Sequence, residues 1–370
     1  MLLSTTLRLF LDGIGRREEY EFYLQKFHSE PGQSFAAVMP DLPSLEQSAD
    51  LMAFDMNFLL RLELAPLVVL SGPEAGAMSE LMQEAAGDAL EVNADASADW
   101  RADVVEMLRQ SRTEGRIALL NGGSRDPGEL IAALAPEVLH RLHILRSVGG
   151  LRDASGGLIA YHWLRGHNER PVSAEDAPLL QFIEACLNDC PSLHVSVASP
   201  LDLLREMFTV KGRGTIVRPG STIVHHSGLS GVDVPRLTAL LTQSFGRSLA
   251  RPESLTGASD IYLESRYRGA ALLERRTEGY YLSKFAVGTE ARGEGLAQEI
   301  WSIVCGAHPA MFWRARPDNP INGWYARQAD GMHRDQPWTI FWRGVHPSHI
   351  PAVIEYCRAR PADFVSASGN

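Results

Sequence analysis

The chain has 370 residues, of which 45% are hydrophobic and 22% are charged, and its net charge is −10. This composition excludes a disordered chain, and the acidic balance argues against a general nucleic-acid binder. One local cluster of Arg and Lys would still be enough to hold a small anionic ligand. The length predicts two or three domains. No apolar run approaches the roughly 20 residues that span a bilayer, so no membrane segment is expected.

The N-terminal residues and the cysteines predict the cellular compartment of the protein and whether it binds a metal ion. The first ten residues, MLLSTTLRLF, lack a basic n-region and a small-residue cleavage site, so no signal peptide is expected. Cys186 and Cys190 are spaced i, i+4, which on a helix is a shared face, and a zinc site would need two further ligands nearby. We therefore expect buried thiols, no metal and a cytoplasmic protein.

The first 220 residues alternate between apolar stripes at helical spacing and short apolar runs that end in glycine-rich turns. This alternation predicts an α/β fold with a mostly parallel sheet and helices on both faces. Helices are expected at 5–14, 20–27 and 45–62, and strands at 35–39, 66–70, 116–120, 141–146 and 194–198.

The pattern changes between about 219 and 232, which predicts a domain boundary and the domains 1–225 and 226–370. His225 and His226 are expected in the linker as surface residues, and the polar tail from Asp363 is expected to be frayed. Beyond the boundary the chain predicts a helix at 235–244, antiparallel strands at 260–264, 269–274 and 280–287, and a helix at 293–305.

A glycine-rich turn joins the last of these strands to the helix at 293–305. Glycines let the backbone approach a ligand closely, and the helix N-terminus that follows presents free N–H groups to an anion such as a pyrophosphate. A glycine turn with no ligand is the alternative. The turn reads Arg292, Gly293, Glu294, Gly295, Leu296, Ala297.

A second cluster of polar and aromatic residues lies in 311–331. Arg314 and Arg316 are two apart on a predicted strand and share one face, and Asn319, Asn322, Trp324 and Tyr325 follow. With the segments YLSKFAV (281–287) and WTIFW (338–342), this order resembles the acetyltransferase domain of vertebrate-type N-acetylglutamate synthases and of bacterial bifunctional synthase–kinases. The resemblance covers about 230–345 and implies a GNAT-type α+β domain.

The resemblance implies a site for acetyl transfer from acetyl-CoA to L-glutamate. Arg suits a carboxylate because it donates two parallel hydrogen bonds, and a phenol can protonate a departing thiolate. No Cys or Ser nucleophile has an adjacent base, which favours direct attack by the amine. The implied roles are carboxylate binding by Lys284, Arg316 and, third, Arg314; substrate holding by Asn319; proton donation at sulfur by Tyr325; thioester polarisation by the Phe285, Ala286 and Val287 backbone; and pyrophosphate binding by Arg292 through Ala297.

Simpler interpretations stand beside these roles. Taken alone, Lys284 would be a surface lysine and Tyr325 a packing tyrosine, and Trp301, Trp313, Trp338 and Trp342 are expected in the core. Tyr325, Asn319 and Lys284 form the expected catalytic set only because they occur together at the family's spacing.

The N-terminal half resembles the acetylglutamate kinase fold over about 15–220, carried by 19–27, 149–153 and 205–215. Two phosphate-binding turns of that family are replaced, K-x-G-G by Met39-Pro40-Asp41-Leu42 and H-G-x-G-P by Ser71-Gly72-Pro73-Glu74. Asp41 and Glu74 have the wrong charge for phosphate, so no kinase activity and no use of ATP are expected. A regulatory or oligomerising domain, forming a homodimer or homotetramer, is implied instead.

An arginine effector is the remaining expectation for this half. The resemblance places an arginine site at Tyr23, Glu206, Phe208, Gly212 and Gly214, and packing roles for the same residues are the alternative. For the whole chain, N-acetylglutamate synthesis is the leading hypothesis. An acetyltransferase for another amino acid and a non-catalytic arginine sensor that regulates a partner enzyme stay open.

Overall fold

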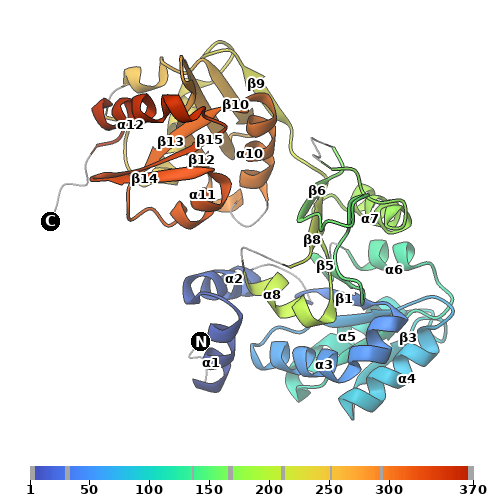
Figure 1. Ribbon diagram of the computed structural model, residues 1–370. Coiled ribbons are helices and arrows are strands. Elements are labelled where there is room, and N and C mark those ends of the chain that lie inside the picture. The colour runs from blue at the N-terminus through green and yellow to red at the C-terminus, as the bar shows by residue number, and fades with distance from the viewer. Residues whose placement is uncertain are drawn as a thin grey trace. The chain divides into compact units, whose positions relative to one another are not determined.

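The computed structural model describes residues 5–29, 34–135, 137–165, 170–209, 213–250, 252–291 and 295–365. The chain divides into two compact units, and the division falls between Pro219 and Gly220. Each unit has its own sheet (Figure 1).

The first unit is built on an eight-stranded sheet in the order β3-β4-β2-β1-β5-β7-β8-β6. All of its strand pairs are parallel except β7 with β8. The α/β class and the mostly parallel sheet are therefore confirmed. The strands are β1 (Ala37–Pro40), β2 (Leu67–Leu70), β3 (Leu90–Asn93), β4 (Ala118–Asn121), β5 (Arg141–Leu145), β6 (Tyr161–Trp163), β7 (His194–Ala198) and β8 (Thr215–Arg218).

Helices cover both faces of this sheet because its central strands are apolar on both sides. Within β2, Val68 packs with helices α1 to α4 and α8, and the next residue, Val69, packs with α5, α6 and α7. The helices are α1 (Thr5–Ile14), α2 (Arg17–Ser29), α3 (Leu42–Arg61), α4 (Ala75–Ala86), α5 (Trp100–Glu114), α6 (Pro127–Leu134), α7 (Ala177–Asp189), η1 (Pro200–Asp202) and α8 (Leu203–Phe208).

The second unit is built on a seven-stranded sheet in the order β14-β15-β13-β12-β11-β10-β9. Its neighbours are antiparallel except β12 and β13, which run parallel in the middle of the sheet. The strands are β9 (Ile223–His226), β10 (Asp260–Glu264), β11 (Gly269–Arg276), β12 (Gly279–Val287), β13 (Met311–Ala315), β14 (Gly331–Asp335) and β15 (Trp338–Arg343).

The two faces of this sheet carry different helices (Figure 1). Helices α10 and α11 pack on one face, and α9 and α12 pack on the other. No helix of the described residues is long and apolar enough to cross a membrane. The helices are α9 (Val234–Phe245), η2 (Pro252–Leu255), η3 (Thr289–Ala291), α10 (Leu296–Ala307), α11 (Asn322–Gln328), η4 (Pro347–His349) and α12 (Ile350–Ala359).

Two sequence-based expectations about the ends of this unit are wrong. His225 and His226 lie on β9 rather than in a linker, and the His225 ring is 2.8 Å from the Asp260 carboxylate because β9 pairs with β10. The first part of the tail, 363–365, is docked, since backbone hydrogen bonds tie it to residues 248–250, and residues 366–370 lie outside the described residues. Such tertiary pairings leave no periodic signal in the sequence.

Candidate active site

The two parallel strands of the second unit, β12 and β13, separate after a short stretch of pairing. The gap between them is called here the parting. β12 and β13 pair only at Tyr280 with Met311 and at Tyr281 with Phe312. In the described part of the chain, the remainder of β12 has no ladder partner on that side. Backbone groups along an unpaired strand need another partner, so the parting is a place where a ligand can add to the sheet.

The register between β11 and β12 shows which backbone groups face the parting. The Gly288 N–H donates to the Arg268 carbonyl at 2.8 Å, and Ala286 lies opposite Ala270. Donors alternate sides along an antiparallel strand, so the Ala286 N–H points toward β11, while those of Phe285 and Val287 point into the parting. Of the three predicted amide donors, two are directed at the open side.

Lys284 is not the surface lysine that its residue type alone suggests. It is 1% exposed and lies on the sheet face covered by α9 and α12. Its ammonium group donates to the Ser254 carbonyl at 3.0 Å and to the Ser283 hydroxyl at 2.9 Å, and it is 3.4 Å from the Asp363 carboxylate. Burial lowers the pKa of Lys284, and the nearby Asp363 opposes that effect.

Arg314 and Arg316 share one face, as predicted, and Trp338 is their common platform. The two guanidinium carbons lie 3.9 and 4.2 Å from the Trp338 ring centroid. Trp338 is only partly buried, unlike Trp301 and Trp313, so it is a cation–π partner rather than a core residue. The sequence interpretation missed this role, because the pairing of β15 with β13 is what brings Trp338 to the two arginines.

Tyr325 lies on the opposite face of the sheet, within an aromatic cluster. Its ring is 5.4 Å from that of Trp313 and 5.7 Å from that of Phe341, and the side chain is 7% exposed. Burial raises its pKa well above the ordinary value for a phenol. A phenol in this environment keeps its proton at neutral pH. Trp324 stacks on Phe285 beside it, with an interplanar angle of 2°.

Asn319 lies in the turn that joins β13 to α11. Its side-chain oxygen accepts the Ile321 N–H at 3.2 Å, which leaves its amide nitrogen for other partners. Asn322 ties the same turn together through its amide nitrogen, 2.7 Å from the Arg316 carbonyl. The turn therefore connects Arg316 on one face with Tyr325 on the other.

Only part of the predicted pyrophosphate loop is described. Arg292, Gly293 and Glu294 lie outside the described residues. Gly295 is in the left-handed conformation with φ 83° and caps α10, which begins at Leu296 with Ala297 next. The first turn of an α-helix has N–H groups without intrahelical partners, and the anion-binding interpretation depends on those of α10.

The candidate arginine residues of the first unit lie in packed positions. Glu206 is 9% exposed and accepts the Gly214 N–H at 2.9 Å, and burial raises its pKa. Phe208 is fully buried against Phe27, with 5.7 Å between the rings. A Cβ on Gly214 would approach the Val197 carbonyl to 2.2 Å, so this glycine permits close packing. Gly212 lies outside the described residues. Burial also raises the pKa of Tyr23, to which Glu206 contributes.

The first replaced phosphate turn spans the end of β1 and the start of α3, and the second follows β2 directly. Asp41 is the N-cap of α3, and its carboxylate accepts the Ser44 N–H at 2.9 Å. A negative side chain thus occupies the helix N-terminus at which a phosphate would be favoured. Glu74 stands at the N-cap of α4.

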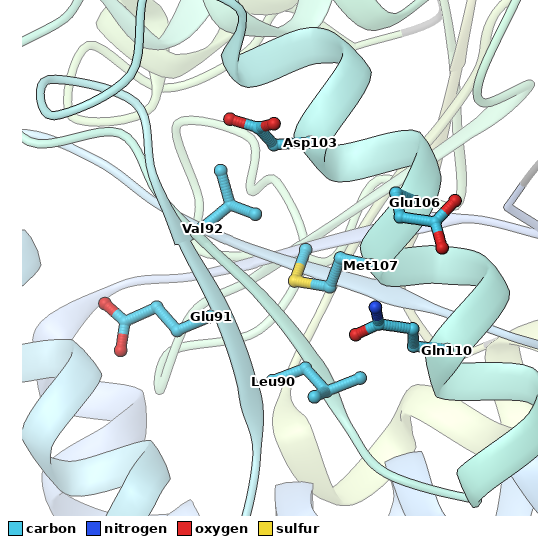
Figure 2. Close-up of a pocket in the computed structure, with 7 residues that line it drawn as sticks. All are labelled: Leu90, Glu91, Val92, Asp103, Glu106, Met107 and Gln110. Atoms are coloured by element: carbon cyan, nitrogen blue, oxygen red, sulfur yellow. The ribbon is translucent and has the colours of Figure 1, made fainter.

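A pocket beside β3 contains none of the predicted site residues. Figure 2 shows it between β3 and α5, with the carboxylates of Glu91, Asp103 and Glu106 around Met107. Its volume of about 190 Å³ is below the roughly 300 Å³ of small-molecule sites, and its charge would repel an anion. Over the described ranges, no group of three or more His, Cys, Asp and Glu side chains could hold a metal ion. The four cysteines are free thiols, and Cys186 and Cys190 are buried as expected.

The sequence is similar to those of several known proteins. Residues 224–360 match the family model described as the N-acetyltransferase of N-acetylglutamate synthase. The chain is 33% identical over 253 residues to an acetylglutamate kinase of Xylella fastidiosa (strain 9a5c), covering 64% of this chain and 58% of that protein. It is 27% identical over 411 residues to the mitochondrial N-acetylglutamate synthase of Homo sapiens, covering 93% of this chain and 76% of that protein.

A solved structure from Neisseria gonorrhoeae is also similar. It is an N-acetylglutamate synthase complexed with coenzyme A and N-acetyl-glutamate, with a TM-score of 0.49 and 16% identity over 89% of this chain and 98% of that chain. The chain spans less than two thirds of the length of the Xylella kinase relatives that it matches.

Proposed function

We propose that the chain transfers an acetyl group from acetyl-CoA to the α-amine of L-glutamate, from the premise that residues 224–360 match the family model described as the N-acetyltransferase of N-acetylglutamate synthase. The observation that carries the proposal is the parting of β12 and β13. Cationic side chains line one face of the sheet beside it, and Tyr325 lies on the other face. A thioester in the parting would be within reach of groups from both faces.

The chemistry follows from these positions. The thioester oxygen accepts hydrogen bonds from the Phe285 and Val287 N–H groups, which stabilise the negative charge that develops on it. Lys284 and Arg316, with Arg314 behind them, attract the carboxylates of the acceptor, and Asn319 orients it. The amine nitrogen forms the new bond to the acetyl carbon, and the C–S bond breaks. The departing sulfur takes the phenolic proton of Tyr325, and the proton that the nitrogen loses on becoming an amide returns to the Tyr325 phenolate.

The test is release of free coenzyme A from acetyl-CoA with L-glutamate, compared with aspartate, glutamine, lysine and no acceptor. We expect glutamate-dependent turnover, and Tyr325→Phe should lower kcat by about 10²-fold, the usual contribution of a general acid. The acceptor KM should change little, because the ring remains. Tyr262→Phe is the matched control, since this buried tyrosine bonds His308 away from the parting. Equal kcat for wild type and Tyr325→Phe would contradict the proton-donor role. Turnover with another amino acid but not with glutamate would show that glutamate is not the acceptor.

For the first unit we propose that kinase activity and ATP use are lost and that the unit serves regulation and assembly, as a homodimer or homotetramer. Asp41 at the N-terminus of α3 supports this, because its charge repels a phosphate. We also propose a cytoplasmic location, which the four free thiols support.

Arginine binding by the first unit is the second candidate function. It is favoured by Glu206, a buried carboxyl group on α8, and by Tyr23, a partly buried residue of α2 that packs against the same hydrophobic core. Calorimetric titration with L-arginine should show binding that Glu206→Gln weakens at least tenfold while acetyl-CoA binding is kept. Binding unchanged by Glu206→Gln would assign this residue to packing alone.

A further inference from the structure

The residues that follow α12 form a docked segment, Arg360–Val365, called here the C-terminal strap. Its Asp363 carbonyl accepts the Ala250 N–H at 2.9 Å, and its Val365 N–H donates to the Ser248 carbonyl at 3.0 Å. The Phe364 ring lies 4.3 Å from the ring of Phe245, the last residue of α9. The strap therefore pairs with the chain that leaves α9.

The strap completes the surroundings of Lys284. An ammonium group has three donors, and Lys284 has three oxygen neighbours, of which Ser254 and Ser283 are neutral. Asp363 provides the negative charge, at 3.4 Å, and the Lys284 side chain is 0% exposed. No donor is left for an incoming carboxylate while Asp363 stays in place.

The strap also occupies Arg314. One guanidinium nitrogen donates to the Cys357 and Arg360 carbonyls, both at 2.6 Å, and the other donates to the Pro361 carbonyl at 2.6 Å. Two of the three cations assigned to the acceptor are thus engaged by the end of α12 and the strap. Arg316, which stacks on Trp338, is the third.

We propose that the strap is a built-in competitor of the acceptor: the Asp363 carboxylate occupies the subsite at Lys284 that a carboxylate of the acceptor takes when the strap leaves. The inference rests on the proposed function. Asp363 is the replaceable neighbour, because 3.4 Å is longer than the 2.7–2.9 Å of a strong charge-assisted hydrogen bond. The apparent affinity for the acceptor is then the intrinsic affinity multiplied by the fraction of molecules with the strap open.

A disulfide can hold the strap closed. Leu249 and Phe364 face each other as an antiparallel bridge flanked by the two backbone hydrogen bonds given above. This is the non-hydrogen-bonded type of pair, whose Cα atoms are about 4.5 Å apart and within the range for a disulfide. Leu249→Cys/Phe364→Cys in the full chain gives a locked form when oxidised and an unlocked form when reduced, with Leu249→Cys alone as the control.

Acceptor binding is measured by calorimetry with L-glutamate and a non-hydrolysable acetyl-CoA analogue present. The oxidised form should bind glutamate at least tenfold more weakly than the reduced form, and Asp363→Asn should bind it several-fold more tightly than wild type. Equal affinity of the oxidised and reduced forms would overturn the proposal. So would weaker binding by Asp363→Asn, because Asp363 would then assist the acceptor.

A ligand-independent readout separates this inference from the proposed function. The sequence has three lysines, Lys26, Lys211 and Lys284, so an amine-acylating ester followed by mass spectrometry reports on Lys284 directly. Lys284 should be acylated in the reduced form and protected in the oxidised form, with Lys26 as the internal reference. If Lys284 is protected in the oxidised form but no form binds glutamate, the strap is still shown to cover Lys284, and glutamate is excluded as the acceptor. Equal labelling of Lys284 in both forms would overturn the proposal, because the strap would then either not open or not shield Lys284.

Discussion

Asp55 is a carboxyl group buried on α3 of the first unit, where it is 4% exposed. Burial disfavours its charged form and raises its pKa to about 7. The folded protein therefore holds a proton between about pH 4 and pH 7 that the unfolded chain releases. By linkage, the associated stability is fully present below pH 4 and is lost as the pH rises to 7.

We predict that Asp55→Asn stabilises the protein more at pH 8 than at pH 5, with a difference of about 2 kcal/mol in the free energy of unfolding, since one pKa unit corresponds to about 1.4 kcal/mol. Urea unfolding of the two proteins at both pH values measures it. Asp50→Asn, an exposed carboxylate on the same helix, is the matched control and should show no such difference. A pH-independent effect of Asp55→Asn would mean that Asp55 is ionised when folded.

At the scale of elements, one ion pair joins α12 to the sheet. Arg360, the residue after α12, donates to both oxygens of Glu274 on β11 at 2.7 and 2.6 Å, and their side chains are 17% and 8% exposed. The Tyr356 hydroxyl reaches the same carboxylate at 3.2 Å. Removing one partner of such a pair leaves a charge in a poorly solvated place.

We predict that Arg360→Met lowers the free energy of unfolding by about 2–3 kcal/mol and that adding Glu274→Gln recovers most of this loss, because the unpaired charge is then gone. Chemical denaturation of wild type, both single variants and the double variant gives the coupling free energy between Arg360 and Glu274. Glu355→Gln on the same helix removes an exposed partner and should cost less than about 1 kcal/mol. A double variant as unstable as the sum of the single variants would show that the pair is not coupled.

At the scale of the whole molecule, the two units have separate hydrophobic cores. A ligand that binds one folded unit raises the stability of that unit alone, by about 2.7 kcal/mol at 100 times its Kd. For a unit of this size, such a gain corresponds to a rise in Tm of about 5–10 °C.

We therefore predict two unfolding transitions in scanning calorimetry. Acetyl-CoA should raise the Tm of one transition and change the Tm of the other by less than about 1 °C. Tyr325→Phe should retain the shift, because the phenol acts in the reaction and not in binding the nucleotide. One transition that moves as a whole would mean that the units unfold together.

The sequence by itself determined the elements and the order of the motifs. Apolar periodicity and glycine turns predicted the strands of both sheets that lie in continuous apolar runs, from Pro66–Leu70 to Tyr280–Val287. Strands β3, β6, β8, β9, β14 and β15 were not predicted. Of these, β3, β6, β9 and β14 are short or polar, and their stability comes from pairing with neighbours and not from their own side chains. Shared-face spacing likewise predicted that Arg314 and Arg316 would lie together.

Only the tertiary structure decided which of those side chains are already engaged. Lys284 has a negatively charged neighbour because the strap, about 80 residues further along the chain, places Asp363 against it. The parting between β12 and β13 depends on where two strands stop pairing. Hydrophobic periodicity is a local property of the chain, whereas a counter-ion, an aromatic platform or an unpaired strand edge depends on which distant segments fold against each other.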